Sequence, residues 1–578
     1  MKEFDFLSSV GDNRKNDSPP VKLVGTGEPG GKAKGLLNAF DLVTELNKKG
    51  DFPSVTVEIP GFIVVQTGVF DLFMRMNNLY ETAYSDEDDD RIAYKFQKAD
   101  LPFEILKDLR EMIININSPV AVRSSGLLED AKYEPFAGIY ATKMLPNNQT
   151  DPDERCRKLF EAVKLVYAST FFKAPKNYMK STGYQIRDEK MAVIVQEVLG
   201  KKHGESFYPD ISGVAKSFNF YPMGRSKPKD GVVSLAVGLG KTIVDGGVTW
   251  TYSPQDPEQS PPFGSVDDML KNTQTRFWNI KLSEPEEFDP LCETEFMTES
   301  EISEADKDKS LSISASTLNE SGRVSPGTGS DGPRIINFAP VLKLELLPLN
   351  DLVKEILNLC SRKFDTPVEI EFALTCEGEG YDVSARFGFL QVRPMVVSDA
   401  DITVTDNEYD DENNLISSEF VLGNGSFSDI KDIIYVKPDT FEARNTQKIA
   451  LEIAKYNEKL TIEKRKFLLI GFGRWGSSDS WLGIPVNWGQ ISNVHTIVEA
   501  GLPNMNVELS QGSHFFHNMT SFGVNYFSVP AYYEKMISWD ILKDQKVSSE
   551  SENVIHISLN KPMLVKIDGK TGRGYIKL

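Results

Sequence analysis

The sequence predicts an α+β protein of two or three domains, for two reasons. Its 578 residues are several times the usual size of one domain. Apolar strand-like runs also alternate with helical patterns over residues 21–200: the run 55–65 precedes the helical stretch 71–80, and the run 119–125 precedes the helical stretch 153–172. This order of strands and helices indicates α/β or α+β construction.

The charge balance limits the class of partner. The chain has 64 basic and 84 acidic residues, which give a net charge of −20. Such a balance argues against a nucleic-acid backbone or an anionic membrane as the main partner. It remains compatible with a small anionic ligand held in a local basic pocket.

Cysteine usage and the N-terminus indicate the compartment. The four cysteines are far apart in sequence and form no Cys-x-x-Cys pair, which favours a reducing environment and argues against a cysteine zinc site. The first 20 residues have no apolar signal core, and no run approaches the roughly 18 apolar residues of a membrane span. We therefore expect a cytoplasmic protein.

Composition also predicts the domain boundaries. Residues 1–20 are polar and end in Pro-Pro, which is typical of a flexible tail. The region 21–397 is the first folded domain, and within it we expect a flexible excursion at about 283–334, where large apolar residues are few. A polar, acidic linker at 398–415 then leads to a separate C-terminal α/β domain, 416–578.

Two predicted strands between positions 367 and 394 carry polar residues at alternate positions. Glu369 and Glu371 share one strand face, and Gln391 and Arg393 share another. If the strands pair, these four side chains meet on one surface, where Mg²⁺ can neutralise the two carboxylates and the guanidinium can bind phosphate. The alternative is an amphipathic hairpin with a polar outer face.

Two further segments carry candidate phosphate ligands. The glycine-rich stretch 25–35 places Lys32 before an apolar helix, and such loops let backbone N–H groups approach phosphate. It does not match the P-loop pattern. Arg123 directly follows a buried strand, where it needs a partner, either a ligand or a salt bridge to Glu129 or Asp130.

Several blocks occur together in the order found in one known family. They are GGK (30–32), PGFIVV (60–65), VAVRSS (120–125), ED (129–130), FAG (136–138), MAVIVQ (191–196), SGVA (212–215), GLG (238–240) and LQVRP (390–394). On these blocks the chain resembles the ATP-binding domain of phosphoenolpyruvate synthase and pyruvate phosphate dikinase, an ATP-grasp-type fold of two subdomains, over about residues 21–397.

The resemblance implies a role for each matching residue. Lys32 and Arg123 would contact the ATP phosphates, and with Arg393 they would stabilise charge on the transferred group. Glu369 and Glu371 would hold Mg²⁺. Gln391 and Arg393 would complete the phosphate and metal site. Gln196 would border the adenine pocket.

The chain departs from the family pattern at two positions in this domain. Lys241 stands where the family usually has an acid after GLG, and Glu369 stands where aspartate is common. The first change places a cation where the family has a carboxylate beside the nucleotide, whereas the second keeps the ligand chemistry but alters its reach.

The C-terminal domain has neither the family's phosphohistidine motif nor the length of a barrel domain. It offers instead a glycine-rich loop with Arg474, Ser477 and Ser478, which can hold an anion or be a tight turn with a structural arginine. His514 and His517 are candidate phosphate acceptors or bases, or else ordinary core or surface histidines.

Three functional hypotheses follow. The first is an Mg·ATP-dependent phosphotransferase whose acceptor is His514, a partner protein or a small molecule near Arg474. The second is an ATP-binding sensor without turnover. The third is the ATP-binding subunit of a split system whose phosphohistidine domain lies on another chain.

Overall fold

The computed structural model of the chain describes most of its length. The described residues are 21–129, 138–182, 185–219, 226–258, 266–271, 273–285, 289–378, 380, 382–395, 402–477, 481–501, 515, 519, 524–531, 537–569 and 571–578. The predicted tail 1–20 and the first part of the predicted linker lie outside them.

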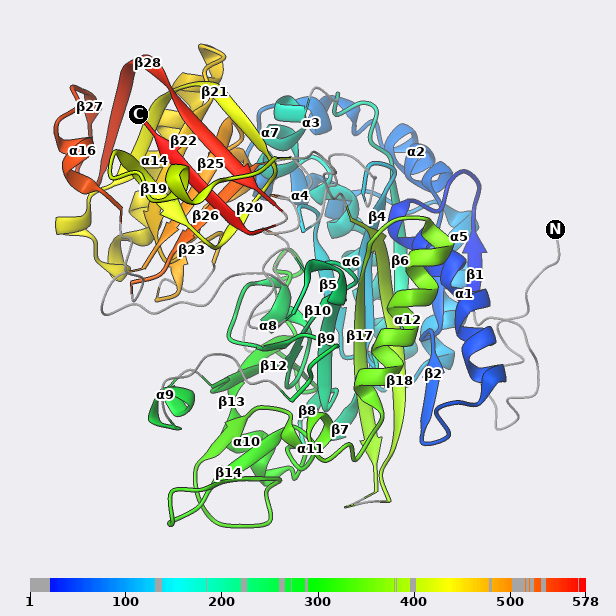
Figure 1. Cartoon of the computed structure of the whole chain (residues 1–578). Coiled ribbons are helices and arrows are strands. Elements are labelled where there is room, and N and C mark those ends of the chain that lie inside the picture. The colour runs from blue at the N-terminus through cyan, green and yellow to red at the C-terminus, as the bar shows by residue number, and fades with distance from the viewer. Residues whose placement is uncertain are drawn as a thin grey trace.

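A five-stranded sheet forms the first layer of the N-terminal region (Figure 1). Its strands, in spatial order, are β1 (Val21–Val24), β3 (Phe62–Val65), β6 (Met191–Glu197), β4 (Val120–Gly126) and β5 (Thr142–Leu145). The side chains of successive β3 residues are buried in two different hydrophobic cores, one on each face of the sheet, because a strand points alternate side chains to opposite faces. The sheet is therefore buried on both faces, which explains its unbroken apolar runs.

Helices cover both faces of this sheet. One face packs against a helical layer, and the other packs against α1 (Gly31–Lys49) and a second sheet. The helical layer consists of α2 (Thr67–Met76), α3 (Tyr80–Tyr84), α4 (Asp89–Lys98), α5 (Phe103–Asn115), α6 (Pro152–Ser169) and α7 (Lys173–Thr182).

The second sheet has six strands and contains the predicted hairpin. In spatial order it comprises β11 (Trp250–Tyr252), β10 (Val232–Ala236), β9 (Ile211–Lys216), β17 (Val368–Glu377), β18 (Ser384–Pro394) and β2 (Val55–Glu58). Helix α12 (Leu349–Phe364) packs against it, and the short α8 (Lys241–Val244) and η2 (Pro228–Asp230) lie in its connections.

The strand-like run 55–65 is divided between the two sheets. Its first part is β2 of the six-stranded sheet and its second part is β3 of the five-stranded sheet. Pro60 lies between them, and because proline has no N–H to donate, the ladder is interrupted there. The expected single strand is thus the link between the two layers.

The expected flexible excursion at 283–334 is wrong for its described residues, which carry regular structure. A four-stranded sheet contains β13 (Met297–Glu301), β12 (Arg276–Lys281), β8 (Ser206–Tyr208) and β7 (Lys201–His203). The neighbouring elements are β14 (Ala315–Leu318), β15 (Val324–Pro326), β16 (Arg334–Ile336), α9 (Val266–Lys271), α10 (Ile302–Lys307) and α11 (Ala339–Leu342).

A few apolar residues are enough to hold this segment in a regular structure, because these residues are buried in the core. Ile302 and Leu311 are buried in the same core as the six-stranded sheet. The Tyr208 hydroxyl donates to Asp308 Oδ2 at 2.7 Å, and Arg334 pairs with Asp306 at 3.0 Å. Composition alone underestimated order here, because it does not report which few side chains are buried.

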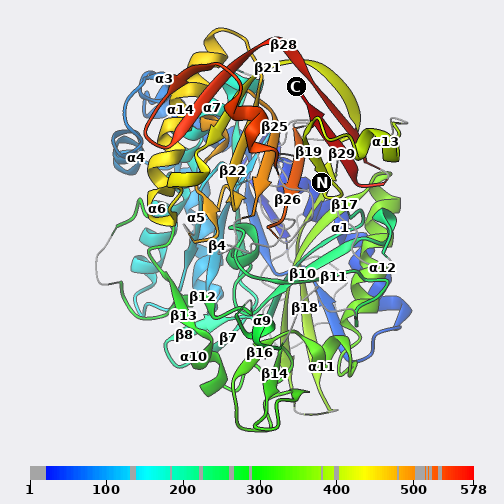
Figure 2. The same ribbon diagram turned by 60° about the vertical axis from the view of Figure 1, so that its left-hand side comes forward.

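The chain after residue 402 builds a nine-stranded sheet of its own (Figure 2). Its main path is β19 (Asn414–Ser418), β29 (Arg573–Lys577), β28 (Val554–Asp568), β21 (Gly425–Val436), β22 (Phe467–Phe472), β25 (Val494–Ala500), β26 (Asn525–Val529) and β20 (Val421–Leu422), and β27 (Val547–Glu550) pairs with β28. The strands β21, β22, β25 and β26 run parallel, with α14 (Thr446–Ile462) as the first crossover. The shorter elements are α13 (Asp406–Tyr409), α16 (Trp539–Lys543), β23 (Arg474–Trp475), β24 (Gly483–Ile484), η3 (Pro438–Thr440), η4 (Ala443–Asn445) and η5 (Trp488–Gln490).

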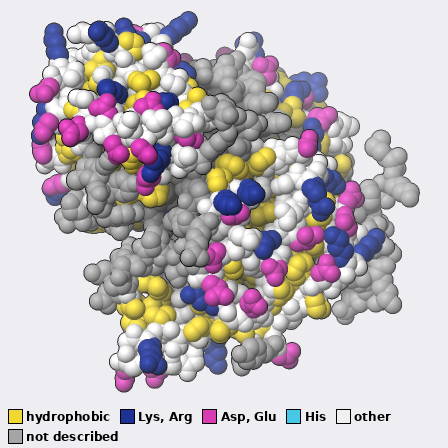
Figure 3. All heavy atoms as spheres, in the orientation of Figure 1, with side chains coloured by type: hydrophobic (Ala, Val, Ile, Leu, Met, Phe, Trp, Pro, Cys, Tyr) yellow, Lys and Arg dark blue, Asp and Glu magenta, His cyan; other side chains and the backbone are white. Residues whose placement is uncertain are grey.

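The surface seen in Figure 3 mixes the two signs of charge. Basic and acidic side chains alternate over the described part of this face rather than forming one large patch of either sign. Among the helices of the described residues, none has both the length and the apolar composition needed to cross a membrane.

A buried acid lies near the carboxyl end of the parallel strands. Glu499 on β25 accepts from the backbone N–H of Trp475 at 2.9 Å and from the hydroxyl of Tyr526. Burial raises the pKa of Glu499 to about 7, although these two hydrogen bonds act in the opposite direction.

We expect Glu499→Gln to become more stable relative to the wild type as the pH rises. In the unfolded chain Glu499 ionises near pH 4.5, whereas the folded protein holds its proton to about pH 7, so the wild type loses up to about 3 kcal/mol across that window. The measurement is the denaturant midpoint of both proteins at pH 5 and pH 8, with the exposed Glu550→Gln as control. An identical difference at both pH values would contradict the buried, neutral acid.

Candidate functional site

A cavity of about 270 Å³ lies between the five-stranded and the six-stranded sheets. Strands β4, β5 and β6 line one side of it, and β9, β17 and β18 line the other. Five of the residues predicted from the sequence line this cavity: Lys32, Arg123, Gln196, Glu371 and Gln391.

Arg123 connects the two sheets across the cavity. Its Nη1 donates to Gln196 Oε1 on β6 and to the carbonyl oxygen of Leu390 on β18, each at 3.0 Å. Its Nη2 donates to Gln391 Oε1 at 2.7 Å and lies 3.4 Å from Glu371 Oε2. The guanidinium therefore holds the predicted polar residues around one point.

A β-bulge makes this arrangement possible. In the hairpin Glu371 pairs with Gln391, but the next residue, Phe372, pairs with Phe389, so Leu390 is extra on β18. A bulged residue leaves the regular ladder, and here the carbonyl of Leu390 accepts from Arg123. The alternation in the sequence predicted the pairing of the hairpin but gave no sign of the bulge.

Glu369 and Arg393 lie one row beyond the cavity lining, in a buried ion cluster. Lys216, Glu369 and Arg393 are cross-strand neighbours on β9, β17 and β18. Lys216 Nζ lies 3.0 Å from Glu369 Oε2, and Arg393 Nε donates to Glu369 Oε1 at 2.8 Å. All three side chains are almost fully buried.

The cluster changes the expected roles of these residues. From the sequence we expected Glu369 and Arg393 to contact the ligand, and Lys216 was missed. The sequence gives one indication of its role, namely that this lysine ends an apolar strand. Burial lowers the pKa of Lys216, and the Glu369 carboxylate counteracts this. Direct contact of Glu369 with a metal, or of Arg393 with phosphate, stays a prediction, while their mutual pairing is what the structure shows.

Lys32 lies at the start of α1 and pairs with Glu129. It also donates to Ser124 Oγ at 3.2 Å. Gly30, which precedes the helix, has a φ of 78°, and a Cβ there would lie 1.7 Å from the Ser125 carbonyl oxygen, so only glycine permits this approach. The alternative pairing of Arg123 with Glu129 is wrong, because Glu129 faces Lys32. Asp130 lies outside the described residues.

Lys241 also lines the cavity, but its charge is balanced locally. Its ammonium lies 2.7 Å from Asp245 Oδ2 and 5.4 Å from the centre of the Trp278 ring. The replacement of the usual acid therefore does not leave an uncompensated positive charge at this end of the cavity.

Arg474 in the C-terminal region points toward the N-terminal region. It donates to the carbonyl oxygen of Gly246 and, at 3.2 Å, to that of Gly247. These carbonyls follow α8, whose Lys241 and Val244 line the cavity. The structure thus supports a structural arginine over an anion-binding one. Ser477 is buried, and the other predicted residues of this region, Ser478, His514 and His517, lie outside the described residues.

A family model for the AMP/ATP-binding domain of pyruvate phosphate dikinase matches residues 27–414, about two thirds of the chain. The chain belongs to this family. The resemblance predicted from the sequence blocks is thereby confirmed. Among curated proteins, none matches the sequence.

The match to the pyruvate phosphate dikinase AMP/ATP-binding domain covers the cavity and almost none of the nine-stranded sheet. All seven predicted residues of the N-terminal site lie inside the matched range, whereas Arg474 and His514 lie outside it. The family relation therefore bears on ATP binding and not on the chemistry of the C-terminal region.

The donors at the cavity fit a magnesium ion brought by a nucleotide. Glu371 offers carboxylate oxygen and Gln391 offers amide oxygen, which are ligands that Mg²⁺ accepts. Within the described residues, no group of three or more His, Cys, Asp or Glu side chains is arranged to hold a metal ion. A bound Mg²⁺ would accordingly take its other ligands from phosphate and water.

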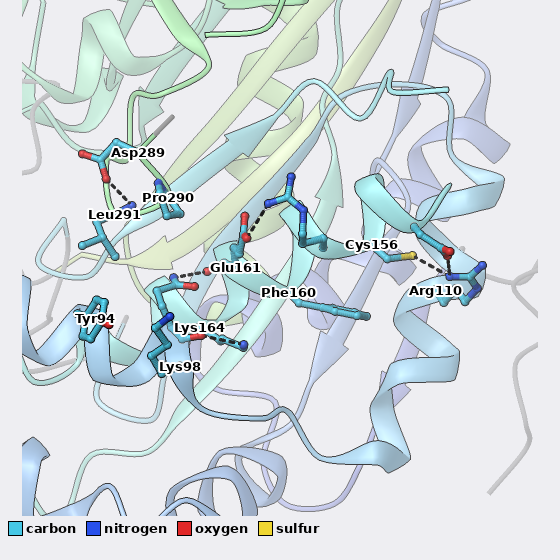
Figure 4. A pocket seen from close by; sticks show the side chains of 13 residues that line it. Tyr94, Lys98, Arg110, Cys156, Phe160, Glu161, Lys164, Asp289, Pro290 and Leu291 are labelled. Atoms are coloured by element: carbon cyan, nitrogen blue, oxygen red, sulfur yellow. Dashed lines mark hydrogen bonds and ion pairs between the residues drawn. The ribbon is translucent and has the colours of Figure 1, made fainter. Parts of the chain in front are cut away.

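A larger cavity, of about 710 Å³, opens between α4, α5, α6 and the loop 289–291 (Figure 4). Several of its charged groups already pair with one another: Arg110 pairs with Asp153, and Arg157 pairs with Glu161 at 2.9 Å. Of the site residues that were predicted from the sequence and that the structure describes, none lines this larger cavity. We therefore place the site in the smaller cavity, where those residues converge.

We expect Glu369→Gln and Glu371→Gln to differ in their effect on stability. The first leaves two buried cations without their carboxylate and lowers the free energy of unfolding by about 3 kcal/mol. The second changes a residue at the cavity surface and costs less than about 1 kcal/mol. Chemical unfolding of both variants measures this, and equal losses would show that Glu369 is not the centre of a buried ion cluster.

Proposed function

We propose that this protein is an Mg·ATP-dependent phosphotransferase, with ATP bound in the cavity between the two sheets of an ATP-grasp-type module. The observation that carries the proposal is the convergence of Arg123, Gln196, Glu371 and Gln391 from four strands and both sheets. A sheet that only needed a polar surface would not gather them on one enclosed point. Membership of an AMP/ATP-binding domain family supports ATP as the ligand.

The cavity has an apolar part and a charged part, as ATP requires. Met144, Val198 and Leu199 supply apolar surface for the adenine. Arg123 supplies a delocalised positive charge for the phosphates, and Lys32 lies at the helix N-terminus beside the same cavity. ATP thus lies with its base toward the β6–β7 connection and its phosphates toward Arg123.

The residues present suit stabilisation of charge on a transferring phosphoryl group. Arg123 is fixed by its hydrogen bonds before any ligand arrives, so little reorganisation is needed when charge develops. Mg²⁺ held by Glu371 and Gln391 would neutralise the phosphate oxygens. The acceptor is His514, a small molecule or a partner protein, and labelling distinguishes among them.

The test is incubation of the purified protein with Mg²⁺ and ATP labelled separately at the β- and γ-phosphates. Acid-labile label mapped to His514 identifies an internal acceptor, and ADP or AMP without protein label identifies a small-molecule acceptor or water. Turnover that appears only after a phosphohistidine-domain protein is added would indicate the split system. Failure to bind ATP would refute the proposal.

Arg123→Met should reduce turnover by about 100-fold or more, because it removes the positive charge that is held in place beside the phosphates. The matched control is Arg386→Met, which lies on β18 and pairs with Glu58 at 3.0 Å but does not line the cavity. Steady-state turnover and ATP affinity are measured for both. Equal activity of the two variants would remove Arg123 from the mechanism.

A second candidate function, an ATP sensor, is favoured by the Arg474 contact. Arg474 holds the turn at Gly246 and Gly247, directly after the cavity residues of α8. Helix α7 also packs against η5 of the C-terminal region. A nucleotide that moves α8 would therefore change contacts in the C-terminal region.

For a sensor, we expect ATP to slow amide hydrogen exchange at 467–477 in the wild type but not in Arg474→Met. The reason is that the variant removes the side chain that links this segment to the turn after α8. Arg444→Met, an exposed arginine paired with Glu442, is the control and should behave as the wild type. If ATP leaves exchange at 467–477 unchanged in the wild type, the C-terminal region does not sense the nucleotide.

A further inference from the structure

Two buried carboxylates bind neighbouring backbone amides at the end of β4. Glu129 Oε2 accepts from the N–H of Gly126 at 3.0 Å, and Glu189 Oε1 accepts from the N–H of Leu127 at 2.7 Å. Glu129 and Glu189 are 1% and 2% exposed. A Cβ on Gly126 would lie 2.9 Å from Glu189 Oε1, so Glu189 packs directly against this backbone. The two acids therefore lie close together and are almost completely removed from water.

The two carboxylates differ in their partners. Glu129 pairs with the ammonium of Lys32, a residue that lines the cavity. Glu189 accepts instead from neutral groups, namely the N–H of Lys190 and, at 2.8 Å, the hydroxyl of Tyr140. Within the described part of the chain, Glu189 has no ion pair. One ammonium therefore lies beside two buried carboxylates.

The charge of Glu189 is weakly compensated by the groups that face it. Burial is the main cause that raises the pKa of Glu189 to about 7, and the negative charge of Glu129 adds to this rise. The Tyr140 hydroxyl and the backbone N–H groups act in the opposite direction. The ammonium of the adjacent Lys190 pairs with Asp71. Glu189 is thus close to the midpoint of its titration at neutral pH, where a change in nearby charge alters its protonation.

ATP bound as proposed above would bring negative charge to the ammonium that Glu129 uses. Lys32 lies at the start of α1 beside the cavity and is predicted to contact the phosphates. Phosphate oxygens compete with Glu129 for the N–H groups of Lys32, and they share its positive charge. Charges interact strongly when they are buried, so the carboxylate pair then holds two negative charges less readily.

We propose that ATP binding is coupled to the uptake of one proton by the Glu129–Glu189 pair, and that Glu189 carries this proton. This rests on the proposed function, because it requires phosphates beside Lys32. The proton comes from solvent and adds to a carboxylate oxygen, and no bond of the nucleotide changes.

The coupling makes the affinity for ATP depend on pH. Below about pH 7 Glu189 already holds its proton in the free protein, so binding requires no uptake. Above this pH the proton must be taken from solvent, and the affinity falls by up to about 10-fold per pH unit. The acid pair therefore favours nucleotide binding on the acidic side of neutrality.

Calorimetric titration with Mg·ATP in buffers of different ionisation enthalpy measures the proton uptake. The observed heat varies linearly with the ionisation enthalpy of the buffer, and the slope is the number of protons taken up. The wild type should take up more than about half a proton per ATP at pH 8, and about 0.1 or less at pH 6. Glu189→Gln has nearly the same shape but no charge to neutralise, so it should lack this uptake at both pH values.

Two further variants test whether Glu189 is the group that takes up the proton. Tyr140→Phe removes a hydroxyl that stabilises the charged form of Glu189, so the pH range of the uptake should move upward. Glu499→Gln is the matched control, because Glu499 is also a buried acid with a pKa raised to about 7 but lies in the C-terminal region. This control should take up as many protons as the wild type.

The outcomes separate this inference from the proposed function. If the wild type binds ATP without proton uptake, or if Glu189→Gln keeps the uptake, the coupling is refuted while ATP binding stands. An unchanged pH range in Tyr140→Phe, or a loss of uptake in Glu499→Gln, would also refute it, because another group would then carry the proton. If the wild type does not bind ATP, both the coupling and the proposed function are refuted.

Discussion

The guanidinium of Arg123 joins the two sheets that enclose the cavity, and the arrangement of the site depends on it. Arg123 takes its partners from β6, β17 and β18, so its position is set by both layers at once. The bulge at Leu390 turns a carbonyl toward it that a regular ladder would have used. Because its terminal N–H groups bond to both sheets while its positive charge lies at the cavity, this residue can fix the separation of the sheets and attract an anion at the same time.

The paired acids of the hairpin have different environments although only one residue separates them. Glu371 lies at the cavity, and Glu369 lies in a buried row between Lys216 and Arg393. Lys216 and Arg393 thus bind the Glu369 carboxylate from the two neighbouring strands. The same cluster fixes β9, β17 and β18 at the end where they line the cavity.

The C-terminal region lies beyond the part of the chain that the family model covers, so the family relation does not indicate its function. Its nine-stranded sheet lies outside the family match, yet Arg474 binds the turn that follows the cavity residues of α8. The cavity and the C-terminal region are therefore connected through the few residues of this turn. In the two functions proposed above, the second half of the chain would either receive a phosphoryl group or respond to the ligand.

The sequence by itself determined the family and the faces on which the polar residues lie. Alternation along 367–394 predicted that Glu371 and Gln391 would share a surface if the two strands paired, as they do, and the ordered blocks predicted the family. Side-chain period and residue type are local properties, so a sequence reports them directly. Only the tertiary structure decided that Glu369 and Arg393 are buried against Lys216, that the segment around Glu293 is folded onto the cavity, and that Arg474 faces the N-terminal region. These outcomes depend on contacts between residues more than 20, and in most cases more than 100, positions apart. Such contacts form because a charged group that is buried when two layers pack must be paired. Which residue becomes its partner depends on the packing and cannot be read from a local sequence pattern.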